Sequence, residues 1–287
     1  MRSGEIRELD MKIAIASGKG GTGKTTVAVS LALSCDGSVA YADCDVEEPN
    51  GHIFLNPCIK GSNKFSLPVP IIQEKKCNFC GKCKEICKFN AITIFGKTIM
   101  TFPEMCHSCG GCFLVCDQEA ISEDRRTIGF VEWGEAQPID FFQGRLRVGE
   151  AMSSPLIKQV KKKASENEYE WLILDAPPGT SCPVIKTVRD TDFVILVTEP
   201  TPFGLHDLQL AVKTISKLGL PMGVIINKWG IGNEEVKNWC ADQGLPILMT
   251  IPFSRKVAEA YATGQSLVQL QPELKNDFRK LLEELKK

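Results

Sequence analysis

The stretch Gly18-Lys19-Gly20-Gly21-Thr22-Gly23-Lys24-Thr25 decides the fold. It fits the pattern G-x-x-x-x-G-K-[ST] and lies between a β-compatible apolar run, Met11–Ser17, and a helix-compatible stretch from Lys24 to about Cys35. Its glycines let backbone N–H groups turn inward around phosphates, and the start of the helix adds a favourable dipole. We expect Lys24 to reach the terminal phosphates and Thr25 to ligate Mg²⁺. The flanking strand and helix disfavour the alternative, a glycine-rich turn without a nucleotide.

Further apolar runs of strand length follow along the chain, with helical stretches between most of them. They are Val39–Asp43, Trp171–Asp175, Phe193–Thr198, Gly223–Asn227 and Ile247–Ile251. This alternation predicts an α/β fold, a mainly parallel sheet with helices on both faces.

The alternation stops between about Gln73 and Glu123, where cysteines and short turns replace the aliphatic residues. We therefore expect an inserted small α+β domain at 73–123, which divides the nucleotide-binding domain into 11–72 and 124–287. The mixed residues of Ile128–Gly149 are interpreted as edge strands that rejoin the main sheet.

Two copies of the run C-x2-C-x2-C-x3-C lie within the inserted segment, a spacing typical of bacterial ferredoxins with two [4Fe-4S] clusters. Three cysteines of each run wrap one cluster, and the fourth crosses to the other. The expected ligand sets are Cys77, Cys80, Cys83 and Cys116 for one cluster, and Cys106, Cys109, Cys112 and Cys87 for the other. The usual proline after the fourth cysteine is replaced by Lys88 and Asp117. Zinc is the chemical alternative, but the evenly packed runs suit iron–sulfur clusters better.

Composition excludes several classes of function. The chain has 287 residues, a formal net charge of −1 and ordinary hydrophobic and charged fractions, so a general nucleic-acid or membrane-surface binder is not indicated. Thirteen cysteines are many, yet no apolar run resembles a signal peptide or reaches transmembrane length. We therefore expect a reducing, cytoplasmic setting, in which clustered cysteines act as metal ligands.

The string KGGTGKT resembles the deviant phosphate-binding loop of the MinD/Mrp superfamily of P-loop ATPases, the class that includes the nitrogenase iron protein. The resemblance implies that Lys19 reaches across an ATP-dependent dimer to the partner's nucleotide. It also implies that Asp45 orients or activates the attacking water, that Asp43 supports the Mg²⁺ shell, and that Asp175 holds Mg²⁺ through water. A solvated loop lysine and strand-end helix caps are the alternatives for these residues.

The resemblance also defines a nucleotide-binding set. Asn227, at the end of a later strand, matches the adenine-contacting asparagine of the class, although a strand-end turn asparagine fits as well. The implied set is Gly18, Lys19, Gly20, Gly21, Thr22, Gly23, Lys24, Thr25, Thr26 and Asn227, of which Lys19 and Lys24 act with Asp45 in catalysis.

Five cysteines lie outside the two runs. Cys182 follows Asp175 at the distance at which the nitrogenase iron protein places a cysteine that binds a cluster bridging its dimer. No convincing second cysteine accompanies it, and the CxxC of Mrp-like carriers is absent. A buried free thiol is therefore the favoured interpretation of Cys182, and more strongly so of Cys35, Cys44, Cys58 and Cys240.

The resemblance implies a function as well as a fold. The leading hypothesis is a Mg²⁺-dependent ATPase whose nucleotide-driven rearrangement, as a homodimer or a heterodimer with a paralogue, gates electron transfer through two clusters to a partner. One alternative is an iron–sulfur carrier that assembles or delivers a cluster to a client protein. Another is a MinD-like positioning switch, in which the clusters would serve only as a fold element or a redox sensor. Such a switch would dock on membranes through the amphipathic ending Leu274–Leu285, but packing of that helix on its own sheet is favoured instead.

Overall fold

The computed structural model describes residues 11–286, which divide into two compact units. The first, the nucleotide unit, comprises residues 1–63, 131–145 and 153–287, of which 11–286 are described. The second, the cysteine unit, comprises residues 64–130 and 146–152. The cysteine unit is longer than the insertion expected at 73–123, because the strands leading in and out belong partly to it and because 146–152 joins it from further along the chain.

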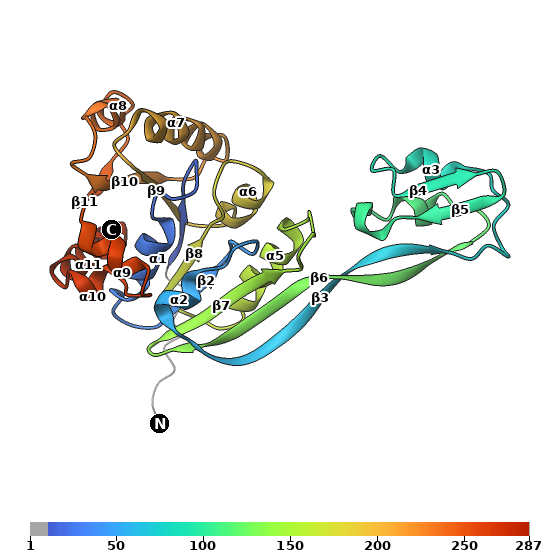
Figure 1. Ribbon diagram of the computed structural model, residues 1–287, viewed down its shortest axis with the longest axis horizontal. Coiled ribbons are helices and arrows are strands. Elements are labelled where there is room, and N and C mark those ends of the chain that lie inside the picture. The colour runs from blue at the N-terminus through green and yellow to red at the C-terminus, as the bar shows by residue number, and fades with distance from the viewer. Residues whose placement is uncertain (1–10, 287) are drawn as a thin grey trace. The chain divides into compact units, whose positions relative to one another are not determined.

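A mainly parallel sheet forms the centre of the nucleotide unit, with the order β11-β10-β9-β1-β8-β2-β7-β6-β3 (Figure 1). The strands from β11 to β7 all pair in parallel. Their bounds are β1 Met11–Ala16, β2 Val39–Asp43, β7 Ile139–Leu146, β8 Trp171–Asp175, β9 Phe193–Thr198, β10 Met222–Trp229 and β11 Ile247–Pro252. The prediction of a mainly parallel α/β sheet is thus confirmed.

Helices cover both faces of this sheet because successive strand residues point to opposite sides. Ile13, Ile15 and Tyr41 face one core, which α1 (Lys24–Ala32), α10 (Leu267–Leu270) and α11 (Glu273–Leu285) complete. On the other face lie α5 (Ser154–Ala164), α6 (Cys182–Val188) and α7 (Pro202–Lys217). The remaining helices of this unit are α2 Gly51–Leu55, α8 Glu235–Asp242 and α9 Arg255–Tyr261. The C-terminal helix packs on its own sheet, since Phe278, Leu281 and Leu282 are buried in the core.

The far end of the sheet differs from the sequence-based expectation. β6 (Ile121–Ala136) and β7 were expected as edge strands, but the edge is β3 (Cys58–Ile72), which the apolar pattern did not reveal. β3 contains Pro68 and Pro70, and proline is tolerated in edge strands because it lacks the N–H that an inner strand must donate.

The cysteine unit contains two short helices and a separate two-stranded antiparallel sheet besides the ends of β3 and β6. The helices are α3 (Lys82–Ile86) and α4 (Gly111–Leu114), the strands β4 (Ile92–Phe95) and β5 (Thr98–Thr101), and a short 3-10 turn spans Pro103–Met105. No helix within residues 11–286 combines the length and apolar character needed to cross a membrane.

Candidate functional site

The glycine-rich loop joins β1 to α1 and leaves the start of the helix open. Gly21 and Gly23 have φ of 78° and 93°, a region that favours glycine, and Gly23 caps α1 with no side-chain hydrogen bond. The first N–H groups of α1 are therefore free to donate to an anion. A Cβ on Gly18 would lie 2.1 Å from the backbone oxygen of Asp207 in α7, so the loop is packed against that helix without room for a side chain.

Lys24 opens α1 and is largely buried beneath this loop. Burial lowers the pKa of its ammonium group, while the carboxylates of Asp175, Asp45 and Asp43 raise it. The lysine therefore lies among the three carboxylates that the sequence singled out. One basic group thus lies beside three carboxyl groups.

Asp43 and Asp175 end neighbouring strands and face each other in register. Both are buried, and burial raises the pKa of each, with Asp175 adding to the rise at Asp43. Asp43 accepts the backbone N–H groups of Asn50 and Gly51, each at 2.9 Å, and that of Asp45 at 3.1 Å. These bonds anchor the start of α2 to the end of β2.

The two carboxylate oxygens of Asp175 have different surroundings. Its Oδ2 accepts the hydroxyl of Tyr41 at 3.0 Å, but its Oδ1 is buried and without a hydrogen-bond partner within the described chain. The carboxylate also interacts with the Thr25 hydroxyl, which lowers the pKa of Asp175 against the larger rise from burial. A buried carboxylate beside a hydroxyl fits a hydrated Mg²⁺, because hard oxygen ligands and retained waters are what this ion prefers. The residues present therefore fit the metal that the sequence implied.

Asp45 lies just beyond the end of β2 and is only half-buried. Burial and the nearby Asp175 raise the pKa of its carboxyl group to about 6, while Lys24 opposes the rise. A carboxylate with this pKa is ionised at neutral pH and is a better base than an ordinary aspartate.

Lys19 is paired within its own chain. Its ammonium group donates to Glu199, which directly follows β9, and Glu199 also pairs with Lys228 at 3.1 Å. Lys228 in turn donates to the Gly21 carbonyl at 2.9 Å. Sequence reasoning missed Glu199 and Lys228, although a carboxylate directly after a parallel strand was the signal that singled out Asp43 and Asp175.

A cavity of about 300 Å³ opens beside the glycine-rich loop. Gly21, Gly23 and Thr26 line one side, and aromatic Phe253 and Tyr261 lie among the other lining residues. Asn227 is on its wall, where its amide donates to the Thr22 carbonyl at 2.8 Å and accepts from the Lys228 N–H at 2.9 Å. This asparagine tethers the loop, and one amide hydrogen remains for a ligand in the cavity.

The two cysteine runs repeat in structure as well as in sequence. Backbone N–H groups of Phe79 and Ser108 donate to the sulfurs of Cys77 and Cys106, and those of Ala91 and Ala120 to Cys87 and Cys116, all at 3.3–3.4 Å. Matching residues have positive φ in both copies, including Gly81 and Gly110 at the starts of α3 and α4. Backbone donors aimed at sulfur favour the thiolate over the thiol.

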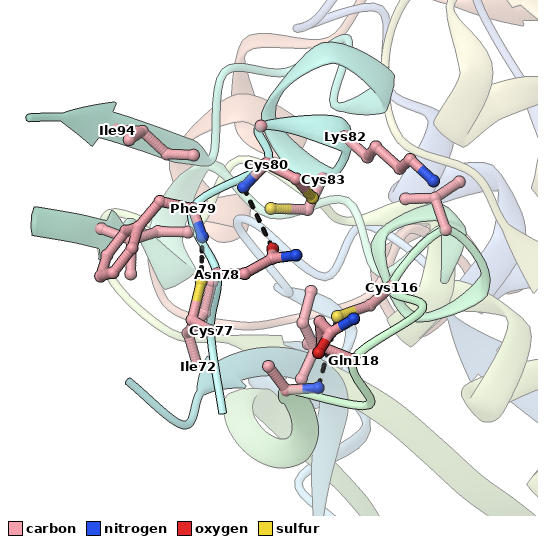
Figure 2. Close-up of a pocket in the computed structure, with 15 residues that line it drawn as sticks. Ile72, Cys77, Asn78, Phe79, Cys80, Lys82, Cys83, Ile94, Cys116 and Gln118 are labelled. Carbon is pink, nitrogen blue, oxygen red and sulfur yellow. Dashed lines mark hydrogen bonds between the residues drawn. The ribbon is translucent and has the colours of Figure 1, made fainter. Parts of the chain in front are cut away.

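The structure groups the eight cysteines into two sets around separate cavities. One cavity is lined by Cys77, Cys80, Cys83 and Cys116, as Figure 2 shows. The other is lined by Cys87, Cys106, Cys109 and Cys112. Each set combines three cysteines of one run with the fourth of the other.

Each of the two cavities is lined by four thiols. Four thiols spread around a cavity suit a cluster with an iron at each corner. Burial raises the pKa of the Cys112 thiol to about 11, and binding a metal would have to displace that proton.

The remaining cysteines are not all buried. Cys44 and Cys240 are buried and Cys35 half-buried, but Cys182 at the start of α6 and Cys58 are exposed. The expectation of a buried free thiol was therefore wrong for Cys182 and Cys58. Each is the first residue of its element, Cys182 of α6 and Cys58 of the edge strand β3.

The fold and the loop together define a P-loop nucleoside triphosphatase. The chain matches the model of the CobQ/CobB/MinD/ParA nucleotide binding domain over residues 13–268, and it belongs to this family. The MinD structure of Pyrococcus horikoshii in complex with Mg-ADP is similar in fold, with a TM-score of 0.57 and 20% identity over 96% of this chain and 95% of that one.

Two relatives in Methanocaldococcus jannaschii match along nearly the whole chain. An uncharacterized protein is 32% identical over 96% of both chains. An iron-sulfur cluster carrier protein is 22% identical over 98% of this chain and 85% of its own length.

Proposed function

We propose that this chain is an ATPase that holds two [4Fe-4S] clusters in its cysteine unit, and that nucleotide-driven rearrangement of a dimer gates electron transfer through them to a partner protein. The observation that supports the proposal most is the grouping of the eight cysteines, three from one run with one from the other, around two cavities. Ligand sets shared in this way keep two clusters near each other, as a path for electrons requires.

The nucleotide unit supplies the groups that ATP hydrolysis requires. Loop N–H groups and Lys24 would hold the phosphates, Thr25 and a water on Asp175 would hold Mg²⁺, and the cavity beside Asn227 would take the base. Asp45 would accept the proton of the attacking water as the bond from its oxygen to the γ-phosphorus forms and the bond to the β-phosphate oxygen breaks.

Lys19 is the residue that supports a dimer in this proposal. In the resemblance it contacts the partner's nucleotide, whereas in this structure it pairs with Glu199 of its own chain. Assembly of the proposed dimer therefore requires Lys19 to break its ion pair with Glu199 and to contact the partner's nucleotide instead. This change of partner would couple nucleotide binding to dimer formation.

Anaerobic potentiometry of the reconstituted protein tests the gating. We expect MgATP, compared with MgADP, to shift the reduction potential of at least one cluster or to change the rate at which an acceptor is reduced. Lys24→Ala should abolish the effect because nucleotide is no longer held. Two intact clusters whose potentials and transfer rates ignore MgATP would rule out the proposal.

A cluster carrier is the second candidate function. It is favoured by the similarity along the whole chain to a protein named as an iron-sulfur cluster carrier, and by the exposed thiol of Cys182. The discriminating measurement is transfer of labelled iron to an apo-ferredoxin. A carrier would release its iron–sulfur cargo in an ATP-dependent manner, and Cys182→Ser would abolish release, whereas an electron-transfer protein would retain all of its iron.

A further inference from the structure

The cysteine unit contains a buried ion pair that the proposed function does not use. Arg126 of β6 donates to Glu150, and their side chains are only 6% and 1% exposed. Two desolvated charges gain little net stability from each other, so such a pair is weak as a stabilising device.

Glu150 lies in residues 146–152, the segment between β7 and α5 that belongs to the cysteine unit. We call this segment the strap. It is fixed to β6 by a hydrogen bond from the Arg147 N–H to the Ile128 carbonyl at 2.8 Å, and Glu150 also accepts the Met152 N–H at 3.0 Å. One carboxylate oxygen of Glu150 is thus bound to the backbone of the strap, and the other accepts from Arg126.

Arg126 reaches a cysteine run directly. Its second guanidinium nitrogen donates to the backbone carbonyl of Cys106, 3.4 Å away, and its Nε is buried without a partner in the described chain. Cys106 is the first cysteine of the second run, and its sulfur accepts the Ser108 N–H. A permanently charged guanidinium group therefore contacts the backbone of a residue whose sulfur is a proposed cluster ligand.

The first run lacks this buried contact, and the charged group at its cavity is exposed: Lys82 lines that cavity and pairs with Asp117, with side chains 53% and 69% exposed. Cys77 occupies the matching position, and within the described residues no side chain donates to its carbonyl. The side chains differ too: Phe89 stacks on His107 beside the second cavity, with ring centroids 3.6 Å apart, while Gln118 and Asn78 occupy the equivalent places beside the first. The backbone of the unit is repeated, but the electrostatic surroundings of the two cavities are not.

We propose that Arg126, held by Glu150 of the strap, is a positioning residue that fixes Cys106 and makes the cluster on Cys106, Cys109, Cys112 and Cys87 easier to reduce than its neighbour. The inference rests on the cluster assignment of the proposed function. Positive charge and hydrogen bonds around the ligands stabilise the reduced, more negative cluster. Electrons would therefore leave the first cluster for the second.

Redox titration followed by electron paramagnetic resonance, in the absence of nucleotide, tests this order. Arg126→Gln should lower the equilibrium constant for reducing the second cluster by about tenfold, equivalent to about 59 mV for one electron, and leave the first unchanged. Arg126→Lys should restore most of the loss because it keeps the charge. The matched control is Arg125→Gln, which removes the same charge from an exposed neighbouring residue. Equal shifts in both clusters, no shift, or the same shift in the control would overturn the proposal.

Hydrogen exchange of the metal-free protein provides a readout that needs neither clusters nor ATP. Faster exchange over residues 106–112 in Arg126→Gln and Glu150→Gln, with the rest of the cysteine unit unchanged, is the expected result. Uniform loss of protection throughout the unit would mean a merely structural role and would refute the positioning. If a variant keeps half of its iron, loss of the second cluster supports the proposal and loss of the first contradicts it. If the unmodified chain binds no cluster, the proposed function fails, while exchange still decides whether Arg126 fixes Cys106.

Discussion

The surroundings of Asp45 predict how the rate of ATP hydrolysis depends on pH. Its carboxyl group must be ionised to accept a proton, and burial together with Asp175 raises its pKa to about 6. We therefore expect the rate of ATP hydrolysis to rise with pH through about 6 and then to level off. Asp45→Asn should reduce the rate by about 10²–10⁴-fold and remove this acid limb.

A steady-state pH profile between pH 5 and 8 checks the expectation. Glu47→Gln, a change at an exposed residue two positions away, is the control and should keep both the rate and the acid limb. An acid limb that survives in Asp45→Asn would assign the titration to another group.

At the scale of elements, the shared ligand sets can be tested by combining substitutions. Cys80→Ser and Cys116→Ser should each cost about half of the bound iron, because one of two clusters is lost. If the two cysteines serve one cluster, the double variant should lose no more than either single variant. Cys80→Ser combined with Cys87→Ser should lose all of the bound iron, because these two cysteines are assigned to different clusters.

Iron content and visible absorption after anaerobic reconstitution measure these losses, with Cys58→Ser as an exposed control outside the runs. Complete loss in the Cys80 and Cys116 pair would show that each run serves its own cluster.

The elements that could be predicted were those whose signal is local. Buried parallel strands have continuous apolar runs, and the glycine loop and cysteine spacings are motifs of a few residues. β3 escaped because Pro68, Pro70 and several polar residues interrupt any apolar pattern. The pairs Lys19–Glu199 and Arg126–Glu150 could not be predicted, because each joins segments that only the folded chain brings together.

For the whole molecule, the pairing of Lys19 would set the cost of forming the proposed dimer. Burial raises the pKa of Glu199, but Lys19 and Lys228 outweigh it and hold the pKa below its ordinary value. The pair is partly exposed, so its strength is no more than about 1 kcal/mol. We expect Glu199→Gln to lower the ATP concentration needed for dimerisation by up to about fivefold, and Lys19→Ala to abolish the dimer.

Sedimentation velocity in the Asp45→Asn background, where ATP persists, measures both effects. Lys280→Ala, at an exposed position on α11, is the control. A dimer that forms equally well in Lys19→Ala would exclude Lys19 from the interface.

The order of the strands has a consequence for biosynthesis. β8 lies between β1 and β2 in the sheet, yet it follows the cysteine unit, strap included, along the chain. During translation, β1 has neither of its neighbours, β8 and β9, until well after the last cysteine of the second run has been made. Every residue of the cysteine unit is thus synthesised before the strand that leads into the phosphate-binding loop has its neighbours, so the proposed cluster ligands are complete before the proposed ATP site can be.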